Sequence, residues 1–253
     1  MKKTILETKG LCKSFAHNGG QIQVLSNVNL KIYQGDFTVV MGVSGSGKST
    51  LLYALSGMER ATAGQVLYDG RNLTTMKEKE IARLRYTDFG FVFQQMHLAG
   101  NLSLYENILV PGYLNNTRSA KQVKEQVSML LERMGISHLK KHLPSQVSGG
   151  EQQRCAIARA VINNPKILFA DEPTGALNKK NTIEVLDLFT ELNKEGNSIL
   201  MVTHDMKTAL RANRILYLED GKVAGELCLP DFNRSEEKSR EAQVNAWLSS
   251  LEW

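Results

Sequence analysis

The sequence predicts an α/β protein with a β-rich beginning and a helical segment inserted among its strands. Residues 37–57 read as a short apolar strand, a glycine-rich loop and a helix that ends at a glycine. Residues 4–40 form β-type runs separated by Gly-rich turns. From about residue 95 to 165 the apolar spacing becomes helical: Ser119–Gln122 reads as a capping box, an apolar face runs from Val123 to Met134, and Gly135 closes the helix. We therefore expect an α/β core, an antiparallel β-subdomain and an inserted α-helical subdomain.

Composition limits the classes of protein that this chain can represent. At 253 residues it is long enough for one large domain or two small ones, and 42% of the residues are hydrophobic. The longest apolar runs are about five residues, whereas a membrane span needs ~20, and no signal-peptide core follows the N-terminus. The net charge of +5 is mild and its lysines and arginines are mixed with acids. We expect a cytoplasmic protein and no nucleic-acid partner.

The glycine-rich loop is a candidate phosphate-binding site. The stretch Gly42-Val-Ser-Gly-Ser-Gly-Lys-Ser-Thr50 fits G-x-x-x-x-G-K-[ST] without a mismatch and lies between a strand and a helix. Its glycines let backbone N–H groups turn toward phosphates at a helix N-terminus. The pattern places Lys48 on the β- and γ-phosphates and the Ser49 hydroxyl on Mg²⁺.

Two strand ends carry polar side chains that suit the same chemistry. Gln94 follows the apolar run 89–93, where a polar residue is mostly a solvated strand end, but a glutamine there could also reach a metal or a water beside the phosphates. Asp171 and Glu172 follow the strand 166–170. Adjacent carboxylates there suit a Mg²⁺ ligand and a base for water, and the alternative is an exposed acidic turn.

Three further positions have both a structural and a functional interpretation. Phe15 is expected in a loop between the first β-runs, where it either packs in the core or stacks on a base. Ser148, followed by Gly149 and Gly150, is an N-cap that leaves N–H groups open to an anion, or simply a capped helix. His204 ends the strand 198–203, so it is either structural or placed to meet a γ-phosphate.

The C-terminal tail is predicted to be an amphipathic helix beginning near Ser235 or Glu236. One face carries Val244, Trp247, Leu248 and Leu251, and the polar face carries Lys238 and Arg240 among several acids. A helix this short is not stable alone, so its apolar stripe must be covered. We expect it to pack on the protein, with Trp247 as the anchor, rather than on a membrane.

Taken together and in order, the motifs resemble those of the nucleotide-binding subunits of ATP-binding-cassette (ABC) transporters over residues 4–225. They are Phe15, GVSGSGKST, Gln94, VSGGEQQR, ILFADEP, GALN and His204. The resemblance implies the ABC ATPase fold, with a P-loop NTPase core, and ATP and Mg²⁺ as ligands. It implies one ABC ATPase domain over residues 1–234, a helical subdomain at about 95–165 and a tail at 235–253.

The resemblance also implies a role for each residue that matches a motif. Phe15 stacks on the base, Glu172 polarises the attacking water, His204 is the switch histidine, and Gln94 is the lid-loop glutamine that senses Mg²⁺ and the membrane partner. Mg²⁺ is held by Ser49, Gln94 and Asp171. The phosphates contact Gly42, Ser44, Gly45, Ser46, Gly47, Lys48, Ser49 and Thr50 and, from the opposite subunit, Ser148, Gly149, Gly150 and Glu151.

Three positions depart from the commonest family pattern. Val147 replaces the usual Leu, Glu151 stands where many members have Gln, and Asn178 stands where most have Asp. The Glu variant is similar to the branch of macrolide exporters, lipoprotein-releasing ATPases and antimicrobial-peptide or bacitracin resistance transporters, and Gly175–Asn178 is most similar to the last. Asn178 puts the usual contact of that Asp between subunits in question.

The function that this resemblance implies is an ATPase subunit that powers a separate membrane permease. ATP should join two copies head to tail, and the permease should hold the complex on the inner face of the cell membrane. Met96, Leu98, Leu102 and Leu104 are expected either to receive a permease helix or to pack inward. The alternatives are an ATPase for a membrane complex that signals or regulates cell-wall enzymes, and a soluble DNA-repair or translation ATPase.

Overall fold

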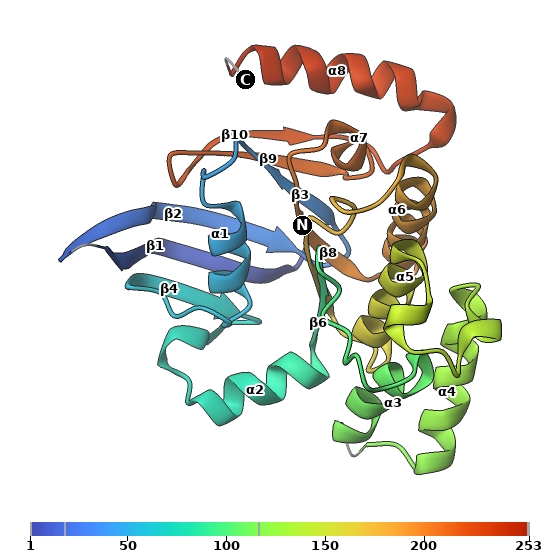
Figure 1. The fold of residues 1–253 in the computed structure, drawn as a ribbon. Helices are drawn as coiled ribbons and strands as arrows, with labels where there is room; N and C mark the ends of the chain where they lie inside the picture. Colours follow the sequence, from blue (N-terminus) through green and yellow to red (C-terminus); the bar gives the residue numbers. More distant parts are fainter. Residues whose placement is uncertain (1, 18, 116, 252–253) are drawn as a thin grey trace. The chain divides into compact units, whose positions relative to one another are not determined.

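The computed structural model describes residues 2–17, 19–115 and 117–251 (Figure 1). The chain divides into two compact units, Met1–Ile81 with Asn193–Trp253, and Ala82–Leu192. Within the described ranges, none of the helices combines the length and apolar character needed to cross a bilayer.

The first unit contains an antiparallel four-stranded sheet in the order β2-β1-β4-β5. Its first two strands form one long hairpin that pairs from Thr4 with Tyr33 to His17 with Gly20, with several register shifts. The separate β-runs expected in this region are therefore continuous strands, because backbone pairing proceeds through polar residues as readily as through apolar ones. Asn18, which belongs to one of the Gly-rich turns expected between these β-runs, lies outside the described residues. The strands are β1 (Thr4–His17), β2 (Gly20–Tyr33), β4 (Ala63–Tyr68) and β5 (Arg71–Asn72).

The prediction that Phe15 lies in a loop is wrong. Phe15 lies on β1 and pairs with Ile22 of β2. The neighbouring Lys13 and Ser14 also pair with β2, so the strand continues through this polar segment. Phe15 is 39% exposed, so it is not a core residue either.

A second layer of strands in this unit carries the candidate loop. Strand β3 (Phe37–Met41) runs parallel to β8 (Ser198–Val202) and to β9 (Arg214–Glu219), and β10 (Lys222–Cys228) pairs antiparallel with β9. Every residue of β3 and β8 is buried, which fits their nearly continuous apolar sequence. Two of the helices in this unit follow these strands: α1 (Lys48–Leu55) follows β3, and α7 (Met206–Ala209) follows β8.

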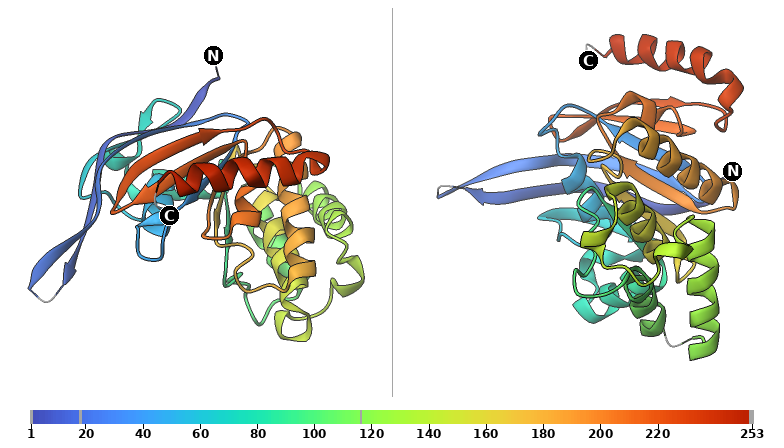
Figure 2. Two further views of the ribbon diagram at one scale, coloured as in Figure 1. Left: turned by 90° about the horizontal axis from the view of Figure 1, so that it is seen from above. Right: turned by 45° about the vertical axis from the view of Figure 1, so that its right-hand side comes forward.

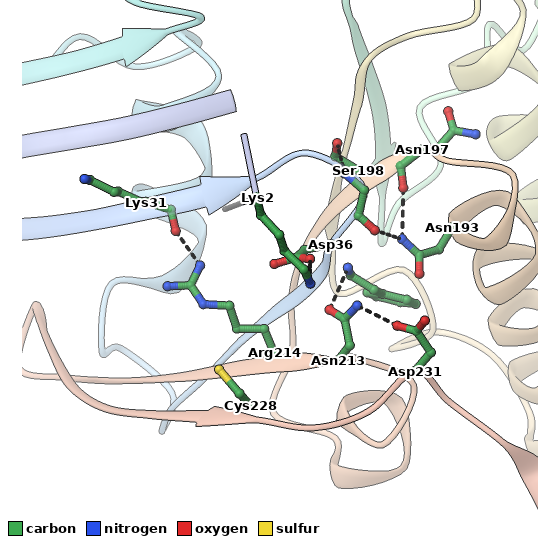
Figure 3. A network of polar contacts seen from close by, with 12 residues as sticks. Lys2, Lys31, Asp36, Asn193, Asn197, Ser198, Asn213, Arg214, Cys228 and Asp231 are labelled. Carbon is green, nitrogen blue, oxygen red and sulfur yellow. Dashed lines mark hydrogen bonds and ion pairs between the residues drawn. The ribbon is translucent and has the colours of Figure 1, made fainter. Parts of the chain in front are cut away.

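A polar network fixes the amino-terminal ends of these strands (Figure 3). The Asn193 amide donates to the Gly35 carbonyl at 2.9 Å, and the Gly35 N–H donates to the Ser198 hydroxyl at 3.0 Å. The Asn213 side chain accepts from the Phe37 N–H at 3.1 Å and donates to Asp231 at 2.9 Å. Because both β3 and β8 start from this network, their carboxyl ends are held in register.

The predicted C-terminal helix is present as α8 (Glu237–Ser249) and packs on the first unit. Figure 1 and both views of Figure 2 show it running along the β9–β10 hairpin. Val244 and Leu248 are buried, and a Cβ atom added to Gly225 of β10 would lie 3.2 Å from the Trp247 ring. The predicted stripe therefore packs on the protein, but its fully buried residues are Val244 and Leu248, and the expected anchor Trp247 is only half-buried.

The placement of Arg240 on the polar face of this helix is wrong. Arg240 is 5% exposed and donates to the carbonyl oxygens of Pro230, at 2.8 Å, and of Ala212. Its guanidinium also lies 5.9 Å from the Phe232 ring. Charge alone suggested exposure, but the aliphatic part of the side chain is buried while the planar guanidinium donates to two backbone carbonyls.

The second unit combines a parallel strand pair with the predicted helical block. Strands β6 (Phe89–Phe93) and β7 (Ile167–Asp171) pair in parallel. Ser103, Ser119 and Ser148 each form a capping box at the start of a helix, and the apolar stripe predicted for residues 123–134 is buried. The helices are α2 (Glu78–Thr87), which begins in the first unit, α3 (Leu104–Leu114), α4 (Ala120–Arg133), α5 (Gly149–Val161) and α6 (Lys179–Lys194).

Candidate nucleotide-binding site

The glycine-rich loop has the backbone of a phosphate cradle. Gly45 and Gly47 adopt φ of 84° and 99°, and Gly42 has φ of 152° with the Leu218 carbonyl oxygen 2.2 Å from where a Cβ atom would lie. Side chains other than hydrogen do not fit this path. Gly47 is the N-cap of α1, no side chain caps that helix, and its first turn contains no acid. The partial positive charge at the N-terminus of α1 is therefore not compensated by an acidic side chain of the helix and can attract an anion bound in the loop.

Two polar side chains of this loop are buried and suit a phosphate. The Lys48 ammonium donates to the carbonyl oxygens of Gly42 and Val43, each at 2.9 Å, and Lys48 is 8% exposed. The Ser46 hydroxyl is 4% exposed and has no hydrogen-bond partner among the described residues. A buried hydroxyl without a partner is costly, and a phosphate oxygen would satisfy it.

The remaining loop positions surround this centre. Ser44 and Gly45 are exposed, whereas Ser49 and Thr50 are half-buried in the first turn of α1. The Gly221 N–H donates to the Ser46 carbonyl at 3.2 Å, which ties the loop to the turn between β9 and β10. The structure thus places all eight predicted loop residues around one helix start.

His204 lies beside the same strand end. Val202 of β8 pairs with Val40 of β3, and the Thr203 N–H donates to the Val40 carbonyl at 3.1 Å. His204 follows directly and is exposed. Asp205 then caps α7 by accepting from the Thr208 N–H at 2.9 Å. The first unit therefore brings His204 and the glycine-rich loop to the ends of adjacent parallel strands.

Phe15 has a cationic neighbour that sequence analysis missed. The Lys13 ammonium lies 4.5 Å from the centre of the Phe15 ring and also pairs with Glu59 at 2.7 Å. Lys13 is buried, so this ion pair and the Arg60 carbonyl, at 2.9 Å, hold it in place. The two residues are separated by one position on a strand, and this i, i+2 spacing was the available signal that they share a face.

In the second unit, Gln94, Asp171 and Glu172 come together. Phe93 of β6 pairs with Asp171 of β7, so Gln94 and Glu172 follow paired positions. A Cβ atom added to Gly175 would lie 2.9 Å from the Gln94 amide nitrogen, which places that side chain against the turn after Glu172. Glu172 has φ of +45°, and both carboxylates are half-buried rather than fully exposed. Left-handed backbone is uncommon at non-glycine residues in general, and the instances that occur cluster at functional sites.

The start of α5 is closed by its own side chains. The Glu151 carboxylate accepts from the Ser148 N–H at 2.8 Å and from the Ser148 hydroxyl at 2.7 Å, while the Glu151 N–H donates back to that hydroxyl at 3.4 Å. Hydrogen bonds from Ser148 lower the pKa of Glu151. Glu151 therefore performs the helix-capping task that a glutamine can perform at the same position.

The two glycines of this segment lie against the first turn of α6 and the residues just before it. A Cβ atom added to Gly150 would be 2.4 Å from Asn181, and one added to Gly149 would be 3.8 Å from Leu177. Asn178 is the residue before α6, and its side-chain oxygen accepts from the Asn181 N–H at 3.0 Å. An Asn before a helix was a usable capping signal that sequence analysis missed.

Fold and site together define a nucleotide-binding protein of the P-loop class, with a phosphate cradle in one unit and paired strand-end carboxylates in the other. A family model described as ABC transporter matches residues 25–175. The chain belongs to this family and is an ATP-binding cassette with the ABC ATPase fold.

Known proteins resemble the chain over most of its length. It is 38% identical over 253 residues to the macrolide export ATP-binding/permease protein MacB of Pasteurella multocida, covering 100% of this chain and 38% of that relative. It thus spans well under half of the length of such relatives. It is 42% identical to an uncharacterized ABC transporter ATP-binding protein, MJ1508, of Methanocaldococcus jannaschii, over 87% of this chain and 97% of the relative.

Solved structures give the same result for the fold. A dimeric post-hydrolysis structure of the ATP-binding cassette MJ0796 bound to ADP and Pi superimposes with a TM-score of 0.84 at 36% identity. The superposition covers 90% of this chain and 100% of that one. The predicted fold class is therefore confirmed.

Proposed function

We propose that this chain binds and hydrolyses ATP and that two copies of it power a separate membrane permease. The observation that carries the proposal is the uncapped start of α1. There Lys48 and the Ser46 hydroxyl, which has no hydrogen-bond partner in the described part of the chain, lie beside left-handed glycines. Such a cradle suits the β- and γ-phosphates of a nucleotide. Phe15, exposed on β1, would stack on the base.

Hydrolysis would rest on the carboxylates at the end of β7. Glu172 would accept the proton of the attacking water, while Lys48 stabilises the charge that develops on the γ-phosphoryl oxygens. His204 would donate a hydrogen bond to the γ-phosphate. Ser49, Gln94 and Asp171 supply the oxygen ligands that Mg²⁺ prefers, and the bound ion would neutralise phosphate charge.

The dimer is the second part of the proposal. The start of α5 presents Ser148, Gly149 and Gly150 but is a separate helix N-terminus from that of α1. In a head-to-tail pair related by a two-fold axis, Ser148–Glu151 of each copy would complete the phosphate site of the other. The dimeric MJ0796 structures support this assembly.

A permease is the partner that the relatives support, since several are named export ATP-binding/permease proteins. We place the contact at residues 94–104, where Met96, Leu98 and Leu102 are half-buried. Leu104 does not belong to this surface, because it begins α3 and is fully buried. Val110, Tyr113 and Leu114 on α3 add exposed apolar area.

Substrate and domain limits follow from the same proposal. The substrate classes that we favour are antimicrobial peptides, lipid-linked molecules and lipoproteins. The names of relatives support export as the activity, with macrolides and syringafactin as the molecules they print. Residues 1–234 would form the ATPase domain, with the helical subdomain at about 95–165, and residues 235–253 the tail. The complex would lie on the inner face of the cell membrane.

A single substitution tests hydrolysis apart from binding. Glu172→Gln should lower kcat by at least about 100-fold, because it removes the proton acceptor, while ATP affinity stays within about threefold. Glu219→Gln, an exposed carboxylate at the end of β9, is the matched control and should hydrolyse ATP normally. Turnover of Glu172→Gln within twofold of the wild type would contradict the role of Glu172.

A further inference from the structure

The loop that follows β6 has a backbone that needs external support. Met96 and His97 adopt φ of 46° and 48°, two consecutive non-glycine residues in the left-handed region. This conformation is unfavourable for residues that carry a Cβ atom, and it persists only where its surroundings impose it. Gln94, the proposed Mg²⁺ ligand, lies two residues before this pair.

Two side chains of α5 supply that support. The Arg159 guanidinium donates to the Met96 and His97 carbonyl oxygens, each at 2.6 Å. Gln153, 0% exposed, donates from its amide to the Phe93 carbonyl at 3.2 Å. Burial lowers the pKa of Arg159, but an arginine remains charged at neutral pH, so both of its bonds are charge-assisted.

We propose that Gln153 and Arg159 form a latch that positions Gln94. Both are positioning residues, because they act on Gln94 through the backbone and need not touch ATP or Mg²⁺. This inference deepens the proposed function and rests on the role given there to Gln94. It adds that the helix carrying the Ser148–Glu151 segment also fixes the loop carrying Gln94.

The geometry explains why two attachment points are needed. Gln153 and Arg159 are six residues apart, which is about 9 Å along a helix. They hold carbonyl groups on both sides of Gln94, at Phe93 and at Met96. Gln94 therefore cannot change its backbone direction without losing one of these hydrogen bonds.

Within the loop, the Met96 N–H also donates to the Phe93 carbonyl at 3.2 Å, so Gln153 shares this acceptor with the turn itself. Two further contacts hold the loop without orienting the Met96 and His97 carbonyl groups. The Ala99 N–H donates to the Asn107 side chain at 2.7 Å, and the His97 ring lies 5.2 Å from the Phe93 ring. The first contact fixes the end of the loop near α3, and the second is a ring contact that does not determine carbonyl direction. The carbonyl groups of the left-handed pair are oriented by Arg159.

Hydrogen exchange of the full chain without nucleotide tests the latch directly. Arg159→Met keeps an unbranched side chain but loses both bonds, so amides in peptides covering 94–99 should exchange roughly tenfold faster. Arg159→Lys lacks the planar fork and should recover only part of the protection. The control is Arg154→Met on the same helix, which breaks an ion pair with Glu184 of α6, at 2.7 Å, and should leave this loop unchanged.

Activity supplies a second readout that a merely structural role would not produce. In Arg159→Met, kcat should fall roughly tenfold and the Mg²⁺ concentration for half-maximal rate should rise, while KM for ATP stays within about twofold. Equal loop exchange in Arg159→Met and the wild type would overturn the latch even if ATP hydrolysis is normal. If the wild type does not hydrolyse ATP, the proposed function fails, and the exchange experiment still decides the latch.

Discussion

The N-termini of helices α1 and α5 are capped in opposite ways. Gly47 begins α1 with no side-chain cap and no acid in the first turn. Ser148 begins α5 with a complete capping box, and the Glu151 carboxylate occupies the Ser148 N–H and hydroxyl. Both segments are expected to meet phosphate, yet only the first presents an uncompensated positive end.

Because of this difference, we expect the start of α1 to bind ATP in a single chain and the start of α5 to act mainly when two chains form a dimer. At α1 the buried Lys48 ammonium and the uncapped helix start add favourable charge for phosphate, so one chain should bind ATP alone. At α5 an anion would approach a carboxylate, and the Ser148 hydroxyl must turn from Glu151 toward the phosphate. The α5 segment should therefore contribute little to the first binding event and mainly to closure of a dimer.

The largest expected effect lies outside both helix starts and separates folding from binding. Leu248→Ala on α8 removes a fully buried side chain and should lower the free energy of unfolding by about 2–5 kcal/mol. ATP affinity of the folded protein should not change. Thermal unfolding of this variant, of a chain lacking residues 235–253, and of the control Asn245→Ala on the exposed face of α8 checks the prediction.

If the chain lacking 235–253 melts and dimerises as the full chain does, the packing of α8 contributes nothing measurable. The first unit would then owe no measurable stability to α8. A fall in ATP affinity without a fall in stability would also contradict the prediction, because it would link α8 to the phosphate-binding loop.

The next largest effect is expected on ATP affinity, from a change at the uncapped N-terminus of α1. Lys48→Ala removes a charged hydrogen-bond donor and should weaken ATP binding by roughly 10- to 150-fold, from about 1.5–3 kcal/mol for such a bond. Fluorescent-nucleotide titration measures this, with the exposed Lys222→Ala of β10 as the control. Unchanged affinity in Lys48→Ala would show that the uncapped start of α1 is not the phosphate cradle.

The smallest effect concerns the closed start of α5. Ser148→Ala removes the cap and should cost about 0.5–2 kcal/mol of stability and weaken the ATP-dependent dimer, while the monomer binds ATP as before. Glu151→Gln keeps an acceptor oxygen and should change stability by less than about 0.5 kcal/mol at neutral pH. Chemical denaturation and sedimentation distinguish the two variants.

The pH dependence of the same pair sharpens this prediction. The folded state lowers the pKa of Glu151, so its contribution is present above the unfolded pKa of about 4.3 and is lost as pH falls through the folded value. Glu151→Gln should remove that acid-side loss of stability. An identical acid limb in the variant and the wild type would contradict the capping role of the carboxylate.

Much of the fold could be predicted because its signals are local. The capping box at Ser119, the glycine after α4 and the stripe of α8 are periodic or adjacent in sequence, and the structure confirms each. The glycine-rich loop has fixed spacing, so its residues could be named individually. Strand ends were equally visible, since polar residues interrupt apolar runs at Gln94 and Asp171.

Contacts between distant segments could not be predicted. Nothing near Arg159 indicates that it holds carbonyl groups more than sixty residues earlier, and backbone carbonyls carry no sequence signal. Arg240 was misplaced for the same reason, because its partners are carbonyls of Ala212 and Pro230. Phe15 was misplaced because strand pairing with β2 determines the conformation of this polar segment.

The central claim is that the uncapped start of α1 in one copy and the closed start of α5 in the other form one phosphate site. Multi-angle light scattering of Glu172→Gln with ATP and Mg²⁺, at tens of micromolar protein, tests it most directly. We expect a molar mass twice that of the nucleotide-free chain, and a molar mass closer to that of the monomer when Ser148→Ala is added. A persistent monomer that has bound ATP would contradict it.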